Sequence, residues 1–156
     1  MKRPILAKTS LDEPIEELAR STNHRILAIW AADCAERVLP YFEERYPEDD
    51  RPRKAIEALR KWIRTGEFKM TDVRKASLAA HAAAREVEGD NAARSAARAA
   101  GQAMATAHVS LHAIAAARYA VSAVRDANLS DADAAAIRER EWQYQHLVEL
   151  RTRNFS

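Results

Sequence analysis

Apolar residues recur at helical spacing between residues 22 and 47. Intervals of three or four residues place them on one face of an α-helix. We expect this helix to begin near Thr22 or Asn23 and to end by Pro47. Pro40 has no amide hydrogen and crowds the preceding turn, so a kink or break is expected there. The apolar face consists of Leu27, Trp30, Ala31, Cys34, Val38 and Phe42.

A second apolar stripe follows in residues 50–66, opposite a strongly charged face. It indicates a one-sided surface helix that Asp49 or Asp50 caps and Gly66 ends. Trp62 closes this stripe, so we expect it to be well buried and its truncation to alanine to cost about 3–5 kcal/mol. The stripe consists of Ala55, Ile56, Leu59, Trp62 and Ile63.

Three further segments complete the helical pattern. Thr71 is expected to cap a helix that runs to about Glu88. The stretch 90–127 is too long for one helix in a domain of this size, so we expect a bend or break near Gly101 or in the following turn. A capping pattern at Ser130 predicts the last helix, with a weak apolar stripe of Ala134, Ile137, Trp142, Leu147 and Val148.

Alanine dominates residues 76–136, and no proline interrupts them. Alanine is the best helix former, and its small side chain lets helix backbones approach closely. The pattern predicts an all-α protein of five to seven helices, arranged as a single-domain bundle or a short array of helical hairpins. Residues 1–9 show no periodicity and are expected to form a flexible arm, with residues 10–156 as the helical domain.

The charge balance argues against two classes of partner. The chain has 25 basic and 23 acidic residues, a net charge of +2, which favours neither nucleic acid nor an anionic membrane. No apolar run reaches the length of a membrane span, and we expect a cytoplasmic protein. Cys34 is the single cysteine, so no internal disulfide forms, and its place on the apolar face predicts inert packing.

Three histidines form the first candidate site. His108 and His112 lie four residues apart on one helical face, and His81 lies among alanines one turn from Arg85. They are either packed histidines with hydrogen-bonded rings or the lining of a polar ligand pocket. A metal site needs further ligands, and neither Asp nor Glu lies near the pair on its own helix. We therefore expect no bound metal and no cofactor.

The second candidate group lies on the helix of residues 22–47. Trp30, Asp33 and Arg37 share one side of it, and Asp33 and Arg37 have the spacing of an ion pair. The structural interpretation is that they support helix packing, and the functional one is that they line the ligand pocket. No catalytic triad, phosphate loop or paired-carboxylate motif is visible, so we assign no catalytic residue.

The sequence resembles a bacterial family of all-helical domains whose members are labelled immunity proteins and sometimes exonuclease subunits. The likeness covers about residues 22–125. Its most specific part is Trp-Ala-Ala-Asp-Cys-Ala-Glu-Arg at residues 30–37, and it continues with DRPRKAIE at 50–57, AAHAAAR at 79–85 and AAGQAMATAHV at 99–109. The resemblance implies a cytoplasmic, antitoxin-like protein that binds a cognate toxin.

Three functions therefore remain open from the sequence. The leading hypothesis is a non-enzymatic protein-binding module, an immunity protein. The alternative is a small-molecule-binding or enzymatic domain with a polar pocket around His81, His108 and His112. The third is an oligomeric structural protein.

Overall fold

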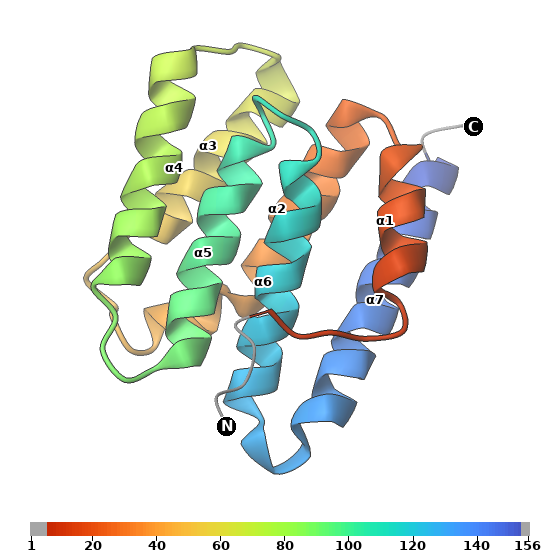
Figure 1. Ribbon diagram of the computed structural model, residues 1–156. Coiled ribbons are helices and arrows are strands. Elements are labelled where there is room, and N and C mark those ends of the chain that lie inside the picture. The colour runs from red at the N-terminus through yellow and green to blue at the C-terminus, as the bar shows by residue number, and fades with distance from the viewer. Residues whose placement is uncertain (1–5, 154–156) are drawn as a thin grey trace.

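The computed structural model describes residues 6–153. These residues form α-helices, one 3-10 turn and no strand (Figure 1), which confirms the predicted all-α fold of five to seven helices. The helices are α1 (Asp12–Arg20), α2 (His24–Glu43), α3 (Arg51–Thr65), α4 (Met70–Arg85), α5 (Asn91–Ala105), α6 (His112–Ala127) and α7 (Ala132–Arg153), with the 3-10 turn η1 (Leu129–Asp131) before α7.

Helix α5 lies at the centre of the arrangement. It packs against α2, α3, α4 and α6, and in Figure 1 α4, α5 and α6 lie side by side in front of α2 and α3. Helix α7 packs on α6 and α2, and α1 packs on α7. The buried positions of α5 are almost all small: Ala92, Ala93, Ser95, Ala96, Ala97, Ala99, Ala100, Gly101, Ala103 and Met104.

Helix α2 supplies more of the large buried side chains than any other helix. Trp30 is fully buried, and its indole Nε1 donates a hydrogen bond to the carbonyl oxygen of Gln143 at 2.9 Å. This bond satisfies the one polar atom that a buried tryptophan brings into a core. The other large core residues include Leu27, Leu39, Phe42, Ile56, Leu59 and Leu147.

Helix ends follow the predicted signals in part. Asn23 caps α2 by accepting a hydrogen bond from the backbone N–H of Ile26 at 2.8 Å, and Gly66 ends α3 with a φ of 70°. Of the kink or break expected at Pro40, the break is wrong, because α2 runs through Pro40 to Glu43. Thr71 was also wrong as a cap, since it lies inside α4.

The long stretch 90–127 divides into two helices, as expected. Helix α5 ends at Ala105, one turn after Gly101, and α6 begins at His112. Gly101 itself stays helical, and it matters because it has no side chain. A Cβ atom built there would lie 2.7 Å from Nε2 of His81, so the glycine lets the imidazole of α4 rest on the backbone of α5.

The first described residues pack on the helices. Ala7 is buried, and its N–H donates to the hydroxyl oxygen of Ser122 at 3.0 Å. Of the arm predicted for residues 1–9, residues 1–5 lie outside the described part of the chain. Among the described residues, no helix combines the length and the apolar composition needed to cross a membrane.

Helix α7 buries a polar face, which its apolar stripe did not predict. Ile137 and Val148 of that stripe are exposed. The buried side chains include Glu139, Arg140 and Gln143 instead. Arg140 is 1% exposed and donates to the carboxylate of Asp12 at 3.0 Å and to Oε1 of Gln143 at 2.9 Å. These bonds offset part of the cost of taking the guanidinium out of water, while its Nη2 is buried without a hydrogen-bond partner among the described residues.

Trp62 is only partly buried, which corrects the expectation that it belongs to the core. Its ring lies beside the imidazole of His24, with centroids 4.9 Å apart, at the edge of α3. The stripe therefore ends in the core at Leu59, and Trp62 lies at the surface.

The two tryptophans should thus differ in their contribution to stability. Trp30→Ala should lower the free energy of unfolding by about 3–5 kcal/mol, because it leaves a cavity and an unpaired carbonyl. Trp62→Ala should lower it by about 1–2 kcal/mol, because less apolar area is removed from the protein. Urea unfolding followed by circular dichroism measures both, and equal losses would contradict the assigned burial.

Candidate functional site

The residues predicted from sequence fall into two groups with different partners. His81, on α4, lies within electrostatic reach of His112 on α6, and His112 lies within reach of His108 in the turn before α6. Asp33 and Arg37 on α2 line a separate shallow cavity together with Glu36, Trp142 and His146. Trp30 lines neither surface, because it is fully buried in the core.

His81 is held in one tautomer. The Nη1 atom of Arg98 lies 2.9 Å from Nδ1 of the imidazole. A guanidinium only donates hydrogen bonds, so Nδ1 accepts and the ring proton lies on Nε2. The absence of a Cβ at Gly101 leaves room for the ring, and Ser77 donates to the carbonyl oxygen of Gly101 at 2.9 Å from the same helix as His81.

Burial and neighbouring positive charge keep His81 neutral. Burial is the largest cause that lowers its pKa to about 4, and the charges of Arg98, Arg85 and His112 lower it further. The pKa of His112 is also lowered, by burial and by His108. At neutral pH the imidazole of His81 is therefore an uncharged hydrogen-bond donor in a positive environment.

His112 and His108 play different parts. Nδ1 of His112 is hydrogen bonded to Oε1 of Gln102 on α5 at 2.8 Å. His108 is exposed, and its ring stacks on that of Phe68 with centroids 6.0 Å apart. The histidine group thus reaches from the α4–α5 contact to the loop between α3 and α4.

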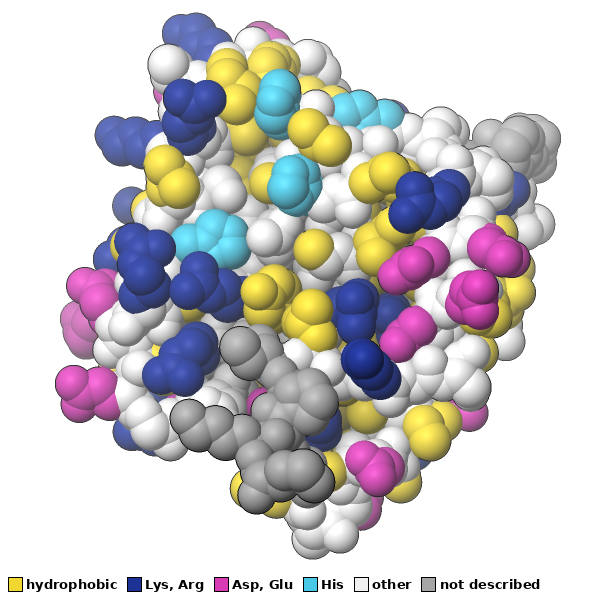
Figure 2. All heavy atoms as spheres, in the orientation of Figure 1, with side chains coloured by type: hydrophobic (Ala, Val, Ile, Leu, Met, Phe, Trp, Pro, Cys, Tyr) yellow, Lys and Arg dark blue, Asp and Glu magenta, His cyan; other side chains and the backbone are white. Residues whose placement is uncertain are grey.

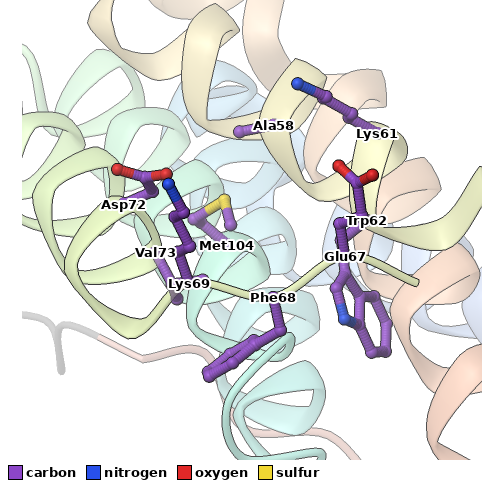
Figure 3. A pocket seen from close by; sticks show the side chains of 9 residues that line it. All are labelled: Ala58, Lys61, Trp62, Glu67, Phe68, Lys69, Asp72, Val73 and Met104. Atoms are coloured by element: carbon purple, nitrogen blue, oxygen red, sulfur yellow. The ribbon is translucent and has the colours of Figure 1, made fainter. Parts of the chain in front are cut away.

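A cavity of about 730 Å³ lies beside this loop (Figure 3). The indole of Trp62 and the ring of Phe68 flank it, and Met104 of α5 and Val73 of α4 contribute apolar side chains. Its full lining is Ala58, Lys61, Trp62, Glu67, Phe68, Lys69, Asp72, Val73 and Met104. The size is that of a typical binding pocket.

Exposed apolar side chains lie in the α3–α4 loop that lines this cavity and in the α5–α6 turn. Phe68 is 43% exposed, and in the α5–α6 turn Val109 and Leu111 are 44% and 38% exposed. Phe68 contacts the same turn through its stacking with His108. We call Trp62, Phe68, Val109 and Leu111 the aromatic rim. Figure 2 shows hydrophobic and histidine side chains together on this face of the molecule.

The ion pair expected between Asp33 and Arg37 is replaced by partners from other helices. Asp33 accepts from Arg60 of α3 at 2.9 Å and from Nε2 of His146 on α7 at 2.7 Å. Arg37 makes two hydrogen bonds to the carboxylate of Glu139, at 2.8 and 2.9 Å. The two residues therefore tie α2 to α3 and α7.

The same cluster contains an aromatic stack. The guanidinium of Arg37 lies 3.8 Å from the ring centroid of Trp142, and the ring of His146 stacks on that of Trp142. Cys34 packs in the core behind it, as expected, and burial raises the pKa of its thiol well above the ordinary value. A thiol in this state is a poor nucleophile.

Sequence reasoning missed most of the partner residues. Arg60, Glu139 and His146 lie on helices far from Asp33 in sequence, and Arg98 and Gln102 looked like ordinary helix-surface residues. The spacing of Arg98 and Gln102, four residues apart, carried a signal that both lie on one face of α5. In the described part of the chain, no group of three His, Cys, Asp or Glu residues has metal-site geometry.

The lowered pKa of His81 predicts a pH dependence of stability. Between pH 6.5 and about 4 the unfolded chain binds a proton at this residue that the folded chain does not. The free energy of unfolding should therefore fall as the pH decreases through this window. When urea unfolding is measured across this pH window, the free energy of unfolding of His81→Gln should depend less steeply on pH than that of the wild type. His146→Gln serves as the control. An unchanged slope in His81→Gln would contradict the neutral state of His81.

The comparisons with known proteins agree with the resemblance noted in the sequence. A family model described as Imm-5 like putative immunity protein matches residues 17–150, which include the aromatic rim, the three histidines and the Asp33 cluster. No significant match was found among curated proteins or among solved structures. Because the family model covers most of the chain, the protein belongs to the Imm-5 like immunity protein family.

Proposed function

We propose that this protein is a non-enzymatic immunity protein that binds a cognate toxin in the cytoplasm and blocks its action. Membership of the immunity family supports a protein partner. The observation that carries the proposal is the aromatic rim: Trp62 and the exposed Phe68 line a cavity of about 730 Å³, and the turn that carries the exposed Val109 and Leu111 contacts Phe68 through His108.

The composition of this surface suits protein recognition. Exposed apolar groups that gather beside a cavity are typical of interaction sites, and aromatic side chains are enriched among the residues that dominate binding energy. Trp62 is tilted against His24, and Nε2 of His24 is hydrogen bonded to the carbonyl oxygen of Thr106. The indole is therefore held in place before a partner arrives, which lowers the entropic cost of binding.

A growth-protection experiment tests the proposal. The protein is co-expressed with a bacterial toxin domain taken from the genes beside its own, and colony formation is counted for each such domain. We expect protection by the wild type, and loss of protection by Phe68→Ala, because the truncation removes an exposed ring from the centre of the rim. Co-purification of the toxin with the wild type measures the complex directly.

The matched control is Leu129→Ala. Leu129 is 65% exposed and lies in η1, in the connection between α6 and α7. Its truncation should leave protection and melting temperature unchanged. Failure of the wild type to protect would reject the proposal. Protection by Phe68→Ala equal to that of the wild type would reject the rim as the binding surface.

The second candidate function is a small-molecule-binding or enzymatic domain that uses His81, His108 and His112. The observation in its favour is the electrostatic coupling of these imidazoles and the pKa of about 4 at His81. A metabolite that raises the melting temperature of the wild type but not of His81→Gln would favour this function over toxin binding.

A further inference from the structure

Arginines in this protein differ in their partners, and several make no ion pair within the described residues. Many pair with carboxylates: Arg37, Arg45, Arg51, Arg53, Arg60, Arg125, Arg138, Arg140 and Arg153. Arg85, Arg94 and Arg98 make no ion pair within the described residues. The Nη2 atom of Arg94 donates to the carbonyl oxygen of Val87 at 2.7 Å, and Arg98 donates to His81. These acceptors leave the positive charges uncompensated.

Arg85 and Arg98 lie next to the imidazole of His81, and Gln102 contacts that of His112. Arg94, Arg98 and Gln102 follow one another at four-residue spacing, so they share one face of α5. His81 comes to this face from α4 and His112 comes to it from α6, through their contacts with Arg98 and Gln102. We call His81, Arg85, Arg94, Arg98 and His112 the arginine–histidine face.

Hydrogen-bond donors outnumber acceptors on this face. Nδ1 of His81 is occupied by Arg98, and Nε2, which carries the ring proton, faces the backbone of α5 at Gly101, so the donors left for a partner are guanidinium N–H groups. Each guanidinium also has more N–H groups than the one or two that bond to the protein. Burial is the largest cause of the lowered pKa of His81, and the charges of Arg98 on α5, Arg85 on α4 and His112 on α6 lower it further.

The arginine–histidine face adjoins the aromatic rim. His108 stacks on Phe68 of the rim and acts on His112 of the face. Figure 2 shows Lys and Arg side chains along one flank of the histidines, on the same side of the molecule as the hydrophobic ones. A partner that covers the rim therefore reaches these arginines as well.

We propose that the arginine–histidine face binds aspartate or glutamate side chains of the partner protein, next to the apolar contact at the aromatic rim. This inference rests on the proposed immunity function and adds the chemistry of the partner. A carboxylate matches the donors available, since it accepts two N–H groups from one guanidinium, and Arg85 and Arg98 both have N–H groups that are not bonded within the described residues. The continuity with an apolar surface favours an acidic protein segment over a nucleic acid, whose phosphates would need a longer basic track.

The test uses the full-length protein and a hexaglutamate peptide at physiological ionic strength. NMR spectra of the histidine ring C–H groups report the site, because five histidines give few signals. We expect the peptide to shift the signals of His81 and His112 and to leave that of His146, which is bonded to Asp33, unchanged. Arg98→Gln should weaken the apparent affinity by about tenfold, since a charge-assisted contact is lost.

Arg138→Gln is the matched control. Arg138 is exposed on α7 and pairs with Asp131, so its loss should leave the peptide affinity unchanged. If Arg98→Gln lowers the melting temperature, Arg85→Gln, which breaks no hydrogen bond or ion pair within the described residues, replaces it and should weaken binding as well. No shift at His81 and His112, or equal weakening by Arg138→Gln, would overturn the inference.

Two further experiments distinguish carboxylate recognition from general anion binding, and test the inference separately from the immunity function. A thymidine hexanucleotide or inorganic phosphate that shifts His81 at the same concentration as the peptide would overturn carboxylate recognition in favour of a general anion site. In the growth assay, the inference is supported if the Arg98→Gln variant folds but no longer protects cells from the toxin. Full protection by a folded Arg98→Gln would overturn it while the immunity function stands.

Discussion

Close packing around α5 is the constraint on which the rest of this structure depends. A helix that contacts four others has little room for large side chains, so its buried positions are alanine, serine, glycine and one methionine. The close approach of the neighbours brings their side chains over the outward face of α5. His81 rests on Gly101 for this reason, and the donors of α5 meet imidazoles from both flanking helices.

The fold was largely predictable because its signals are local. Helical spacing, alanine content and the glycines at 66 and 89 depend on neighbours in sequence, and the observed helices follow them. The exceptions have physical causes that do not depend on neighbours in sequence. Helix α2 tolerates Pro40 in its last turns, where the residue is exposed, and Trp62 lies at the end of α3, where no further helix covers it.

The candidate site was predictable only in its individual residues. The histidines stood out because imidazoles are rare among alanines, and Asp33 and Arg37 stood out because they lie on an apolar helix. Their partners come from α3, α5 and α7, and a periodic pattern within one helix carries no information about which other helix lies beside it. The polar buried face of α7 was not predicted for the same reason. In the sequence Glu139 and Arg140 resemble solvent-exposed residues, and their burial follows only from their contacts with Arg37 and Asp12.

The contact between Asp12 and Arg140 joins the two ends of the chain, because α1 and α7 are its first and last helices. Arg151 strengthens the link by donating to the carbonyl oxygen of Leu18 and to the hydroxyl of Thr22. Detachment of α1 would leave a buried guanidinium without its carboxylate, and such a loss is far more costly than fraying of an ordinary terminal helix. We therefore expect the amides of α1 and α7 to exchange together, because the two helices open as one cooperative unit.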